Sequence, residues 1–504
     1  MSTDVRRRKK NEFDREQVPM EIVVAAQRLQ ERFMAEGFPS FTLAEQFAYL
    51  IYIRMKRPDT ELLPFDLSWI RPGEKDLQTV LDELSRENNA PDFLFGAKLL
   101  EEHRLLFEVW NLTSEVIRLC GAQETGKGEC RQQGNDVSAL QMNIASIKNE
   151  EAVRERAALV LDCILDTVRA TCRDVFLTPR PLVHAIGAML DWEQAETFWD
   201  PACGTGSFLA EAWSRKGKKG KLSGLFGTEL SETMILEARI RRYFNNMPRE
   251  RTVLVQGNAF SCAGVQYDRI VSNPPVISSA GEGRGDYRPE IATRKVNLQF
   301  LQLIMDSLKK GGQAAVIINE NVLFSDQATE IAIRKRLVER QGLYAVISLP
   351  QGAFAPAATG KMSVLFFGGA CKPSVFFYEV EHIGSSRFEK HGDAAESDLP
   401  DLLRKWKNRS KLLEKWQAAC ETSVAVNEYH VEVPGKWKQK NCWFASREAI
   451  RRTAYNLAAK IYRPQEKQRE VYEAPEQILK TLAELERRTK DKIDELTEIM
   501  KDYE

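Results

Sequence analysis

One four-residue segment, Asn273-Pro274-Pro275-Val276, has the composition of a site that holds an amino group. The side-chain carbonyl of Asn273 and the backbone carbonyl of Pro274 are two acceptors in fixed directions, because neither proline carries an N–H. Such acceptors can bind the hydrogens of an exocyclic amine and localise its lone pair while a methyl group arrives. A plain proline-rich loop is the alternative, but the strand predicted over residues 267–272 leads directly into the segment and favours the chemical interpretation.

A second motif follows an upstream strand and has the features of a cofactor site. Glycines at 204 and 206 let the backbone approach a ligand closely, and the helix expected from Ser207 offers free N–H groups. Glu229, at the end of the next predicted strand, can accept both hydroxyls of a ribose. The chain has no Walker lysine, which suits S-adenosylmethionine because that cofactor carries no phosphate. The motif comprises Asp200, Pro201, Ala202, Cys203, Gly204, Thr205, Gly206, Ser207 and Phe208.

A third segment, residues 176–180 (Phe-Leu-Thr-Pro-Arg), precedes a predicted helix. Thr178 is placed to cap that helix, and Pro179 suits its first turn. A simple helix start is one interpretation. The other, which the distance to Asp200 favours, is that the segment closes over the methionine end of the cofactor.

Composition narrows the class of protein. A chain of 504 residues with 43% hydrophobic and 29% charged residues can form two or three domains, and it has no apolar run long enough to span a bilayer. Its basic start has no apolar segment behind it, so we expect a cytoplasmic protein with no membrane contact. Lys plus Arg and Asp plus Glu both total 72, so any contact with nucleic acid must be local or supplied by a partner.

Nine cysteines and five histidines are scattered without the spacing of metal ligands, so we expect reduced thiols and no bound metal. The basic run over residues 215–221 is interpreted as a solvated loop.

Three regions are predicted: an all-helical domain over residues 1–150, an α/β domain over 151–400 and a helical region over 401–504. Short β-branched runs alternate with helices in the middle region, which predicts a Rossmann-like parallel sheet. Ligands bind beyond the carboxyl ends of such strands, so both motifs should share one edge. Strands are expected at residues 197–200, 222–228, 252–256, 268–272, 313–318, 343–349, 361–367 and 374–380.

The last region is charged and helical, with a strand-like stretch at residues 423–433 and an aromatic segment at 442–444. Residues 474–503 form one long predicted helix. Seven positions at alternating spacings of four and three form a heptad seam, interrupted by two polar residues, which suggests a partner helix. The positions are Ile478, Leu482, Leu485, Thr489, Lys492, Leu496 and Ile499.

With these motifs, the chain resembles the modification subunits of type I restriction-modification systems, which methylate adenine N6 in DNA. The segments that carry the resemblance, beyond the two motifs, are residues 176–180, 349–356 with the following strand 361–367, 377–378, 398–402 and 462–464. The similarity extends over nearly the whole chain.

The resemblance implies that Asn273 and Pro274 hold the adenine amine of a flipped base, with Pro275 and Val276 completing the catalytic motif. It also implies a complex in which a specificity subunit reads double-stranded DNA, a restriction subunit cleaves it, and two modification subunits clasp the duplex. The final helix would dock on the specificity subunit. The residues implied for S-adenosylmethionine are Phe176, Thr178, Pro179, Asp200, Ala202, Gly204, Thr205, Gly206, Ser207, Phe208, Glu229, Leu230, Asn258 and Ala259.

Two positions depart from the family pattern. Asn258 replaces an aspartate but keeps an oxygen that can accept a bond from the cofactor's adenine. Val276 replaces an aromatic ring whose stacking on the base is worth roughly 1–3 kcal/mol. Tyr287 could supply a substitute ring, although an exposed loop tyrosine is the simpler interpretation.

Two other functions stay open, the first because of Val276 and the second because of the Asn-Pro-Pro motif itself. One is a catalytically weak or silent relative that binds the cofactor and clamps DNA as a structural subunit. The other is methylation of a glutamine amide in a protein, a reaction that also uses Asn-Pro-Pro motifs but needs neither the helical domain nor the final helix.

Overall fold

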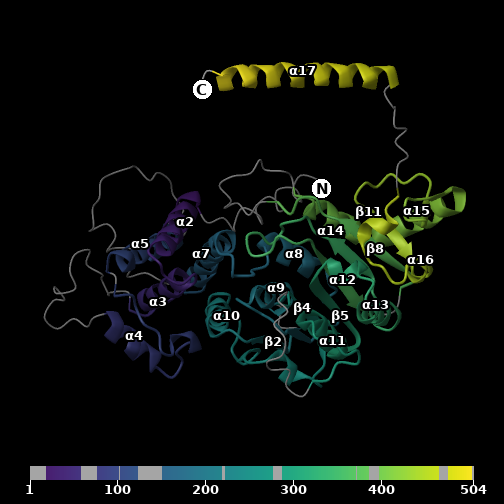
Figure 1. Cartoon of the computed structure of the whole chain (residues 1–504). Helices are drawn as coiled ribbons and strands as arrows, with labels where there is room; N and C mark the ends of the chain where they lie inside the picture. The colour runs from purple at the N-terminus through teal and green to yellow at the C-terminus, as the bar shows by residue number, and fades with distance from the viewer. Residues whose placement is uncertain are drawn as a thin grey trace, which may run out of the picture. The chain divides into compact units, whose positions relative to one another are not determined.

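The structure, a computed structural model, forms two compact units, one up to Arg463 and a second from Pro464 onward, each described by itself (Figure 1). Among the described residues, no helix combines the length and the apolar character that crossing a membrane requires. The structure describes residues 19–57, 77–101, 103–122, 150–217, 222–275, 287–369, 372–384, 397–464 and 475–501.

The N-terminal part is helical, as predicted. Apolar residues at helical spacing on α2, such as Ile22, Ala26, Leu29 and Phe33, are all buried and form one side of a helical core. Its elements are α2 (Met20–Ala35), α3 (Thr42–Lys56), α4 (Leu77–Ser85), the short 3₁₀ helix η2 (Asp92–Leu94), α5 (His103–Ala122) and α7 (Glu150–Thr171).

The helical core extends past residue 150. Residues of α7 and the following Val175 and Leu177 belong to it, together with Ile240 and Phe244 from a helix of the sheet region. The helical part and the sheet are therefore packed against each other through shared apolar contacts. The domain boundaries at residues 150 and 400 stay predictions.

A nine-stranded sheet forms the centre of the first unit, in the order β11-β8-β6-β7-β5-β4-β1-β2-β3. The order runs outward in both directions from the β1–β4 pair, which makes the carboxyl ends of these two strands the switch point where ligands bind in open α/β sheets. The strands are β1 (Thr197–Asp200), β2 (Gly224–Glu229), β3 (Thr252–Gln256), β4 (Tyr267–Ser272), β5 (Leu308–Asn319), β6 (Ala345–Ser348), β7 (Met362–Gly368), β8 (Ser374–Glu379) and β11 (Cys442–Ser446).

Two strands run against the predicted parallel arrangement. β7 is antiparallel to both β5 and β6, because residues 349–361 between β6 and β7 contain no helix, and a parallel return needs a long crossover that is usually helical. β11 is antiparallel to β8 and comes from the aromatic segment of a region predicted to be helical. The strand-like stretch at residues 423–433 forms a separate two-stranded sheet of β9 (Val424–Val426) and β10 (Glu432–Pro434).

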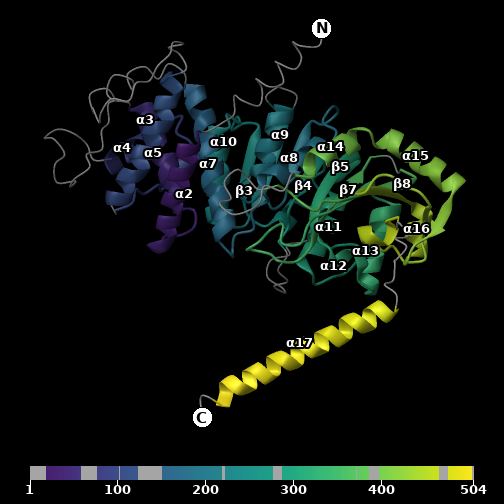
Figure 2. The ribbon, with the colours of Figure 1, turned by 90° about the horizontal axis from the view of Figure 1, so that it is seen from above.

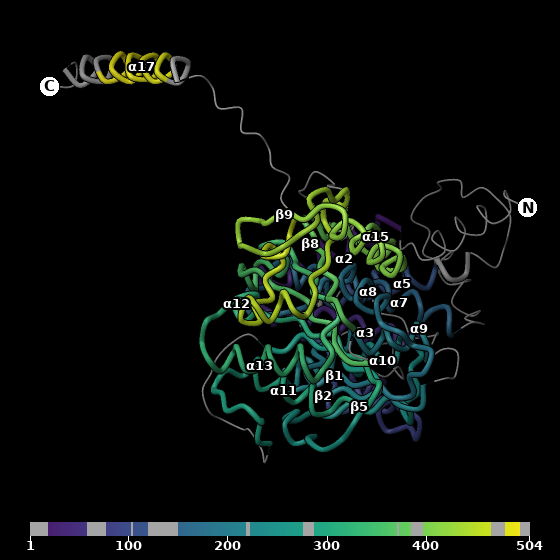
Figure 3. The backbone as a smooth tube through the Cα atoms, turned by 90° about the vertical axis from the view of Figure 1, so that its right-hand side faces the viewer, coloured from purple at the N-terminus to yellow at the C-terminus, as the bar shows by residue number. Residues whose placement is uncertain are grey.

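Helices cover both faces of the sheet, with α8, α9, α10 and α14 on one face and α11 and α13 on the other (Figure 2). The path through β8, β9 and α15 can be followed in Figure 3. The helices are α8 (Arg180–Met189), α9 (Ser207–Arg215), α10 (Glu232–Phe244), η4 (Ala259–Cys262), α11 (Val296–Asp306), α12 (Asn321–Phe324), α13 (Ala328–Glu339), α14 (Leu399–Lys407), α15 (Arg409–Thr422), α16 (Arg447–Arg452) and η5 (Ala459–Tyr462).

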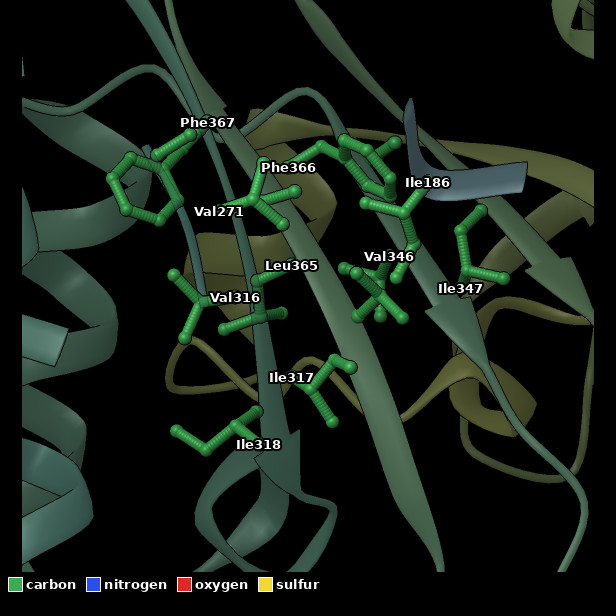
Figure 4. Packing of buried hydrophobic residues seen from close by; sticks show 14 of the residues in the cluster. Ile186, Val271, Val316, Ile317, Ile318, Val346, Ile347, Leu365, Phe366 and Phe367 are labelled. Carbon is green, nitrogen blue, oxygen red and sulfur yellow. The ribbon is translucent and has the colours of Figure 1, made fainter. Parts of the chain in front are cut away.

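The central strands are buried on both faces, which fits their nearly continuous apolar sequences. Figure 4 shows buried side chains of three neighbouring strands, among them Val271 of β4, Val316 and Ile317 of β5, and Leu365 and Phe366 of β7. This rigid core fixes the strand ends that carry the two motifs.

The second unit contains the long helix predicted near the C-terminus, α17 (Pro475–Lys501). Leu479, Leu482, Leu485 and Ile493 are each more than half exposed on it. Two of them, Leu482 and Leu485, are positions of the predicted partner-binding seam.

Candidate active site

The two motifs end neighbouring parallel strands and are joined by a hydrogen bond. β1 pairs with β4, which brings the end of β1 at Asp200 close to the end of β4 at Ser272, the last residue before Asn273. The Ser272 hydroxyl donates to Asp200 Oδ1 at 2.8 Å, and both residues are almost fully buried. The glycine-rich turn and the Asn-Pro-Pro segment therefore start from a common, rigid point.

Asp200 also accepts a bond from the backbone N–H of Ala202, at 3.1 Å, which shapes the start of the turn. Burial raises the pKa of this carboxyl to about 7, although the bonds from Ser272 and Ala202 act in the opposite direction. The role of Asp200 in this structure is to connect the two motifs, and its 1% exposure leaves little surface for a ligand.

The turn after Asp200 has the backbone conformation that its glycines allow. Gly204 and Gly206 have φ values of +52° and +77°, in the left-handed region that favours glycine. A Cβ on Gly206 would lie 3.3 Å from the Cβ of Ala238, so the glycine also permits close packing of the turn on α10. Arg241 of α10 donates from Nε to the Thr205 carbonyl at 2.8 Å.

Arg241 is in turn held by Asp162 of α7, and the same carboxylate lies 3.4 Å from Arg180 at the start of α8. Burial opposes ionisation of Asp162, but the charges of Arg241 and Arg180 outweigh it and hold the pKa below its usual value. We call Asp162, Arg241 and Arg180 the Asp162 cluster. It connects the helical part to the Thr205 turn and to the segment that precedes α8.

Glu229 lies where the sequence predicts it, at the carboxyl end of β2 beside the turn. Its two carboxylate oxygens accept the N–H groups of Gly204 and Ser231, each at 2.9 Å. Each oxygen can accept a further bond, so both remain usable by hydroxyl groups. Leu230, the next residue, is 74% exposed and provides an apolar surface next to these acceptors.

Asn258 follows β3 and lies near Glu229, because the Gly257 N–H donates to the Glu229 carbonyl at 2.9 Å. Its side-chain oxygen caps the short helix η4 by accepting the Phe260 N–H at 3.0 Å. The neighbouring Ala259 is buried. Asn258 thus has a local structural role in addition to the cofactor contact that its sequence position predicts.

The segment before α8 alternates between buried and half-buried residues. Val175 and Leu177 are buried in the helical core, whereas Phe176 and Thr178 are half-buried. The prediction that Thr178 caps α8 is wrong. Pro179 is the N-cap residue and its carbonyl accepts the Leu182 N–H, so Thr178 lies one position too early to cap the helix.

Thr178 instead contacts the Asn-Pro-Pro segment. The Asn273 amide donates from Nδ2 to Thr178 Oγ1 at 3.2 Å. Within the described part of the chain, no donor is bonded to Asn273 Oδ1, which leaves that oxygen available to a substrate amine. Pro274 is buried and Pro275 is exposed, while Val276 lies outside the described residues.

The interpretations of Tyr287 and Lys216 as exposed residues are wrong, and residues 218–221 of the basic run lie outside the described residues. Tyr287 is 9% exposed, stacks on Phe260 and donates its hydroxyl to Asp306 at 2.7 Å, so it is neither an exposed loop residue nor a free ring for a base. Lys216, in the basic run, is buried and donates to the carbonyls of Trp192 and Glu193 rather than extending into solvent. In both cases a distant backbone or carboxylate partner, which the local sequence does not reveal, fixes the side chain.

Ser272, Asp162 and Arg241 are residues of the site that the sequence did not single out. Ser272 could have been noticed as the polar end of an apolar strand that leads into Asn273. Asp162 and Arg241 carry no such signal, because they lie inside ordinary amphipathic helices.

Comparison with known proteins decides the family. The sequence profile of the family described as N-6 DNA Methylase matches residues 167–471, more than half of the chain. The chain belongs to the N-6 DNA methylase family. The matched range contains all the motif residues described above.

Curated relatives of this N-6 DNA methylase include the methylase subunit of the type I restriction enzyme EcoEI from Escherichia coli, which is 30% identical over 220 residues. That match covers 40% of the chain and 44% of the relative, so the matched region spans less than half of the relative's length. The methylase subunit of EcoKI from Escherichia coli K12 is 30% identical over 216 residues, covering 38% of the chain and 40% of the relative.

A solved structure of the methyltransferase subunit of a type I restriction-modification system from Streptococcus thermophilus is similar with a TM-score of 0.55 at 17% identity. The likeness covers 88% of the chain and all of that subunit. It establishes the fold of this N-6 DNA methylase as mixed α/β and methyltransferase-like, following an N-terminal helical region.

Proposed function

We propose that the chain is the modification subunit of a type I restriction-modification system and transfers a methyl group to adenine N6 in DNA. The observation that carries the proposal is the arrangement of Asn273 at the end of β4, beside the glycine-rich turn at the end of β1. The Ser272–Asp200 bond connects the two, and no donor among the described residues is bonded to Asn273 Oδ1. Family membership and the similarity to type I methylase subunits support the same reaction.

The residues around the glycine-rich turn fit S-adenosylmethionine. The turn has no side chain at Gly204 or Gly206, Glu229 offers carboxylate acceptors for ribose hydroxyls, and Leu230 offers an exposed apolar face for an adenine ring. When bound, this cofactor would supply an electrophilic methyl group on a sulfonium. Phe176, Thr178 and Asn258, and their neighbours Pro179, Ala202, Thr205, Ser207, Phe208 and Ala259, complete the proposed surround.

The Asn-Pro-Pro segment would hold and activate the acceptor amine. Asn273 Oδ1 and the Pro274 carbonyl would accept the two N–H groups of adenine N6, which draws the nitrogen lone pair out of the ring and directs it to the incoming methyl. The bound methyl donor would leave with the electrons of its methyl–sulfur bond as the nitrogen takes up the methyl group. The extra proton on nitrogen then leaves to water, so no general base is needed at the start.

The target base must leave the duplex to reach this site, because its amino group is otherwise paired. The formal charge of the chain is zero, so we propose that most sequence-specific contact with DNA comes from a specificity subunit. α17 would bind that subunit through its exposed apolar side chains. A restriction subunit and a second copy of this chain would complete the assembly.

The test is transfer of a tritiated methyl group to DNA by the complex purified with its specificity subunit. The wild type should label DNA and should not label protein acceptors, which also tests the glutamine alternative. Asn273→Ala should retain cofactor binding, measured by calorimetry, and lose labelling. Labelling at the wild-type rate by Asn273→Ala would refute the assignment of this residue.

The second candidate function is that of a catalytically weak or silent relative, and the position of Tyr287 supports this alternative. Its ring is committed to Phe260 and Asp306, so it does not replace the aromatic that Val276 lacks. Stacking worth roughly 1–3 kcal/mol would then be missing from base capture. A Val276→Phe variant distinguishes the candidates, because a weak enzyme should gain activity, a silent wild type should become active, and a fully active wild type should gain little.

A further inference from the structure

We propose that a pocket between the helical part and the edge strand β3 is an anion site that binds the phosphate of a nucleotide, free or within a nucleic-acid strand. The pocket measures about 380 Å³ and is lined by residues of η2, α10, β3 and their adjoining loops. Pockets that hold small molecules usually measure roughly 300–1,000 Å³. The size of this pocket therefore suits a small ligand or one unit of a longer one.

The lining of the pocket has an excess of positive charge. Three arginines, Arg239, Arg242 and Arg249, share it with a single carboxylate, that of Asp92. Asp92 accepts a hydrogen bond from Arg242, and the same guanidinium donates to the Thr252 carbonyl at 3.0 Å. Arg242 thus has its partners within the protein, whereas the charges of the other two arginines are poorly compensated.

Arg239 and Arg249 have hydrogen-bond donors to spare. Arg239 is 29% exposed and lies 3.7 Å from Asp92, and its Nε has no hydrogen-bond partner among the described residues. Arg249 is exposed and forms no ion pair with the described part of the chain. A guanidinium is a planar fork of donors that matches the oxygens of a phosphate. Because a phosphate has three terminal oxygens and up to two charges, it satisfies two such groups better than a carboxylate does.

An exposed aromatic ring lies beside these charges. Phe95 lines the same pocket and is 71% exposed, although it is a large apolar residue. Positive charge next to an exposed ring is the combination with which proteins bind the phosphates and bases of single-stranded nucleic acid. Phe95 would stack on the base while the arginines hold the phosphate, so the expected ligand is a nucleotide rather than phosphate alone.

The pocket is separate from the candidate active site. Thr252, in its lining, pairs with Leu225 near the start of β2, whereas Glu229 beside the cofactor turn ends that strand. Strands rise about 3.3 Å per residue, so about 13 Å of strand separates the two positions. A ligand in this pocket would therefore leave the cofactor turn free.

The test measures binding of inorganic phosphate, AMP and a short single-stranded DNA oligonucleotide to the full chain by calorimetry. Excess S-adenosylmethionine is present, which keeps the adenine of AMP out of the proposed cofactor site. The variants are Arg239→Gln, Arg249→Gln and Phe95→Ala. Arg28→Gln is the matched control, because Arg28 is exposed on α2 and forms no ion pair with a described residue. Melting temperature and affinity for S-adenosylmethionine are measured for every variant.

We expect AMP to bind, and Arg239→Gln to weaken its binding about tenfold, the effect of one hydrogen bond from a charged donor. Arg249→Gln should weaken it by a smaller factor, because solvent screens a more exposed charge. This variant removes no ion pair, so it keeps the test valid if Arg239→Gln does not fold. Phe95→Ala should weaken AMP about fivefold or more and leave the affinity for inorganic phosphate unchanged. Arg28→Gln should match the wild type.

The oligonucleotide distinguishes the two sources of the phosphate. Tighter binding than AMP that weakens with salt and is lost in Arg239→Gln would identify a nucleic-acid strand, and equal affinity would identify a free nucleotide.

Four results would overturn the proposal. They are no binding of AMP or the oligonucleotide, equal losses in Arg28→Gln and Arg249→Gln, which would mean general ionic attraction, and wild-type affinity for AMP in Phe95→Ala. The fourth is binding of a peptide of alternating aspartate and phenylalanine that AMP does not displace and Arg239→Gln abolishes, which would make the pocket a docking site for protein.

Discussion

Asp162 holds both Arg241, which bonds the Thr205 turn, and Arg180, at the start of α8. Asp162→Asn therefore tests how the proposed cofactor site is held in place. The substitution keeps the shape of the side chain and removes its charge. Arg241, whose side chain is 7% exposed, then loses its ion-pair partner while it still bonds the Thr205 carbonyl. Arg180 loses the same partner.

The expected magnitude follows from the burial of the pair. Removing one partner of a buried ion pair costs about 3–5 kcal/mol, because the remaining charge is left uncompensated. Unfolding entropy of about 2.1 cal/mol/K per residue gives about 1 kcal/mol/K for the unit that ends at Arg463, so the melting temperature should fall by about 3–5 °C. A loosened turn should also bind S-adenosylmethionine about tenfold more weakly, the effect of one hydrogen bond from a charged donor.

Asp92→Asn is the matched control. Asp92 of η2 holds Arg242, which is 8% exposed, and lies 3.7 Å from Arg239, so it also ties the helical part to α10. Arg242 bonds the Thr252 carbonyl on β3 rather than the cofactor turn. Differential scanning fluorimetry and calorimetry should therefore show a similar loss of melting temperature in both variants and a loss of cofactor affinity only in Asp162→Asn. Wild-type affinity in Asp162→Asn, or equal losses in both variants, would refute the role of the Asp162 cluster in holding the turn.

Three further predictions concern buried groups. Burial raises the pKa of Asp200 from 3.8 to about 7, so its contribution to stability is complete below about pH 4 and is lost, by about 4 kcal/mol, as the pH rises to about 7. In Asp200→Asn the melting temperature should therefore change less with pH over this range than in the wild type. Parallel curves of melting temperature against pH for the two proteins would contradict this. Gly206→Ala should lower stability by about 1–2 kcal/mol and weaken cofactor binding, because φ is +77° and Ala238 lies against the site of the new methyl; unchanged calorimetry would count against this. Glu237 is fully buried, both its oxygens lack a partner among the described residues, and burial raises its pKa well above 4.5. The gain in melting temperature of Glu237→Gln over the wild type should therefore be larger at pH 8 than at pH 5. A larger gain at pH 5 would contradict this.

Much of the fold could be predicted because local patterns determine it. Strands such as Thr252–Gln256 and Thr197–Asp200 have the predicted bounds, since a short β-branched or aromatic run between turns is a local signal. The placement of Asp200 and Asn273 near each other also followed from sequence, because carboxyl ends of neighbouring parallel strands share one edge. The direction of β7 and the recruitment of β11 were missed, since pairing direction depends on connections and on distant partners.

Site details depend on contacts between segments that are far apart in sequence. The Thr178 hydroxyl has a local use as a cap and a distant use as an acceptor for Asn273, and only the structure distinguishes the two. The same holds for Tyr287, whose glycine-rich surroundings indicated a loop while Phe260 and Asp306 bury it. Side-chain partners of this kind follow from the packing of the elements, which no local spacing encodes.

The central claim is that Asn273 presents an adenine amine to the methyl donor, and sequencing that detects N6-methyladenine in genomic DNA tests it most directly. DNA from cells with the wild-type gene should carry a methylated adenine in one recurrent sequence motif, and this methylation should disappear when the only copy encodes Asn273→Ala. Persistence of the same methylated motif in the Asn273→Ala cells, or its absence from wild-type cells, would contradict the account.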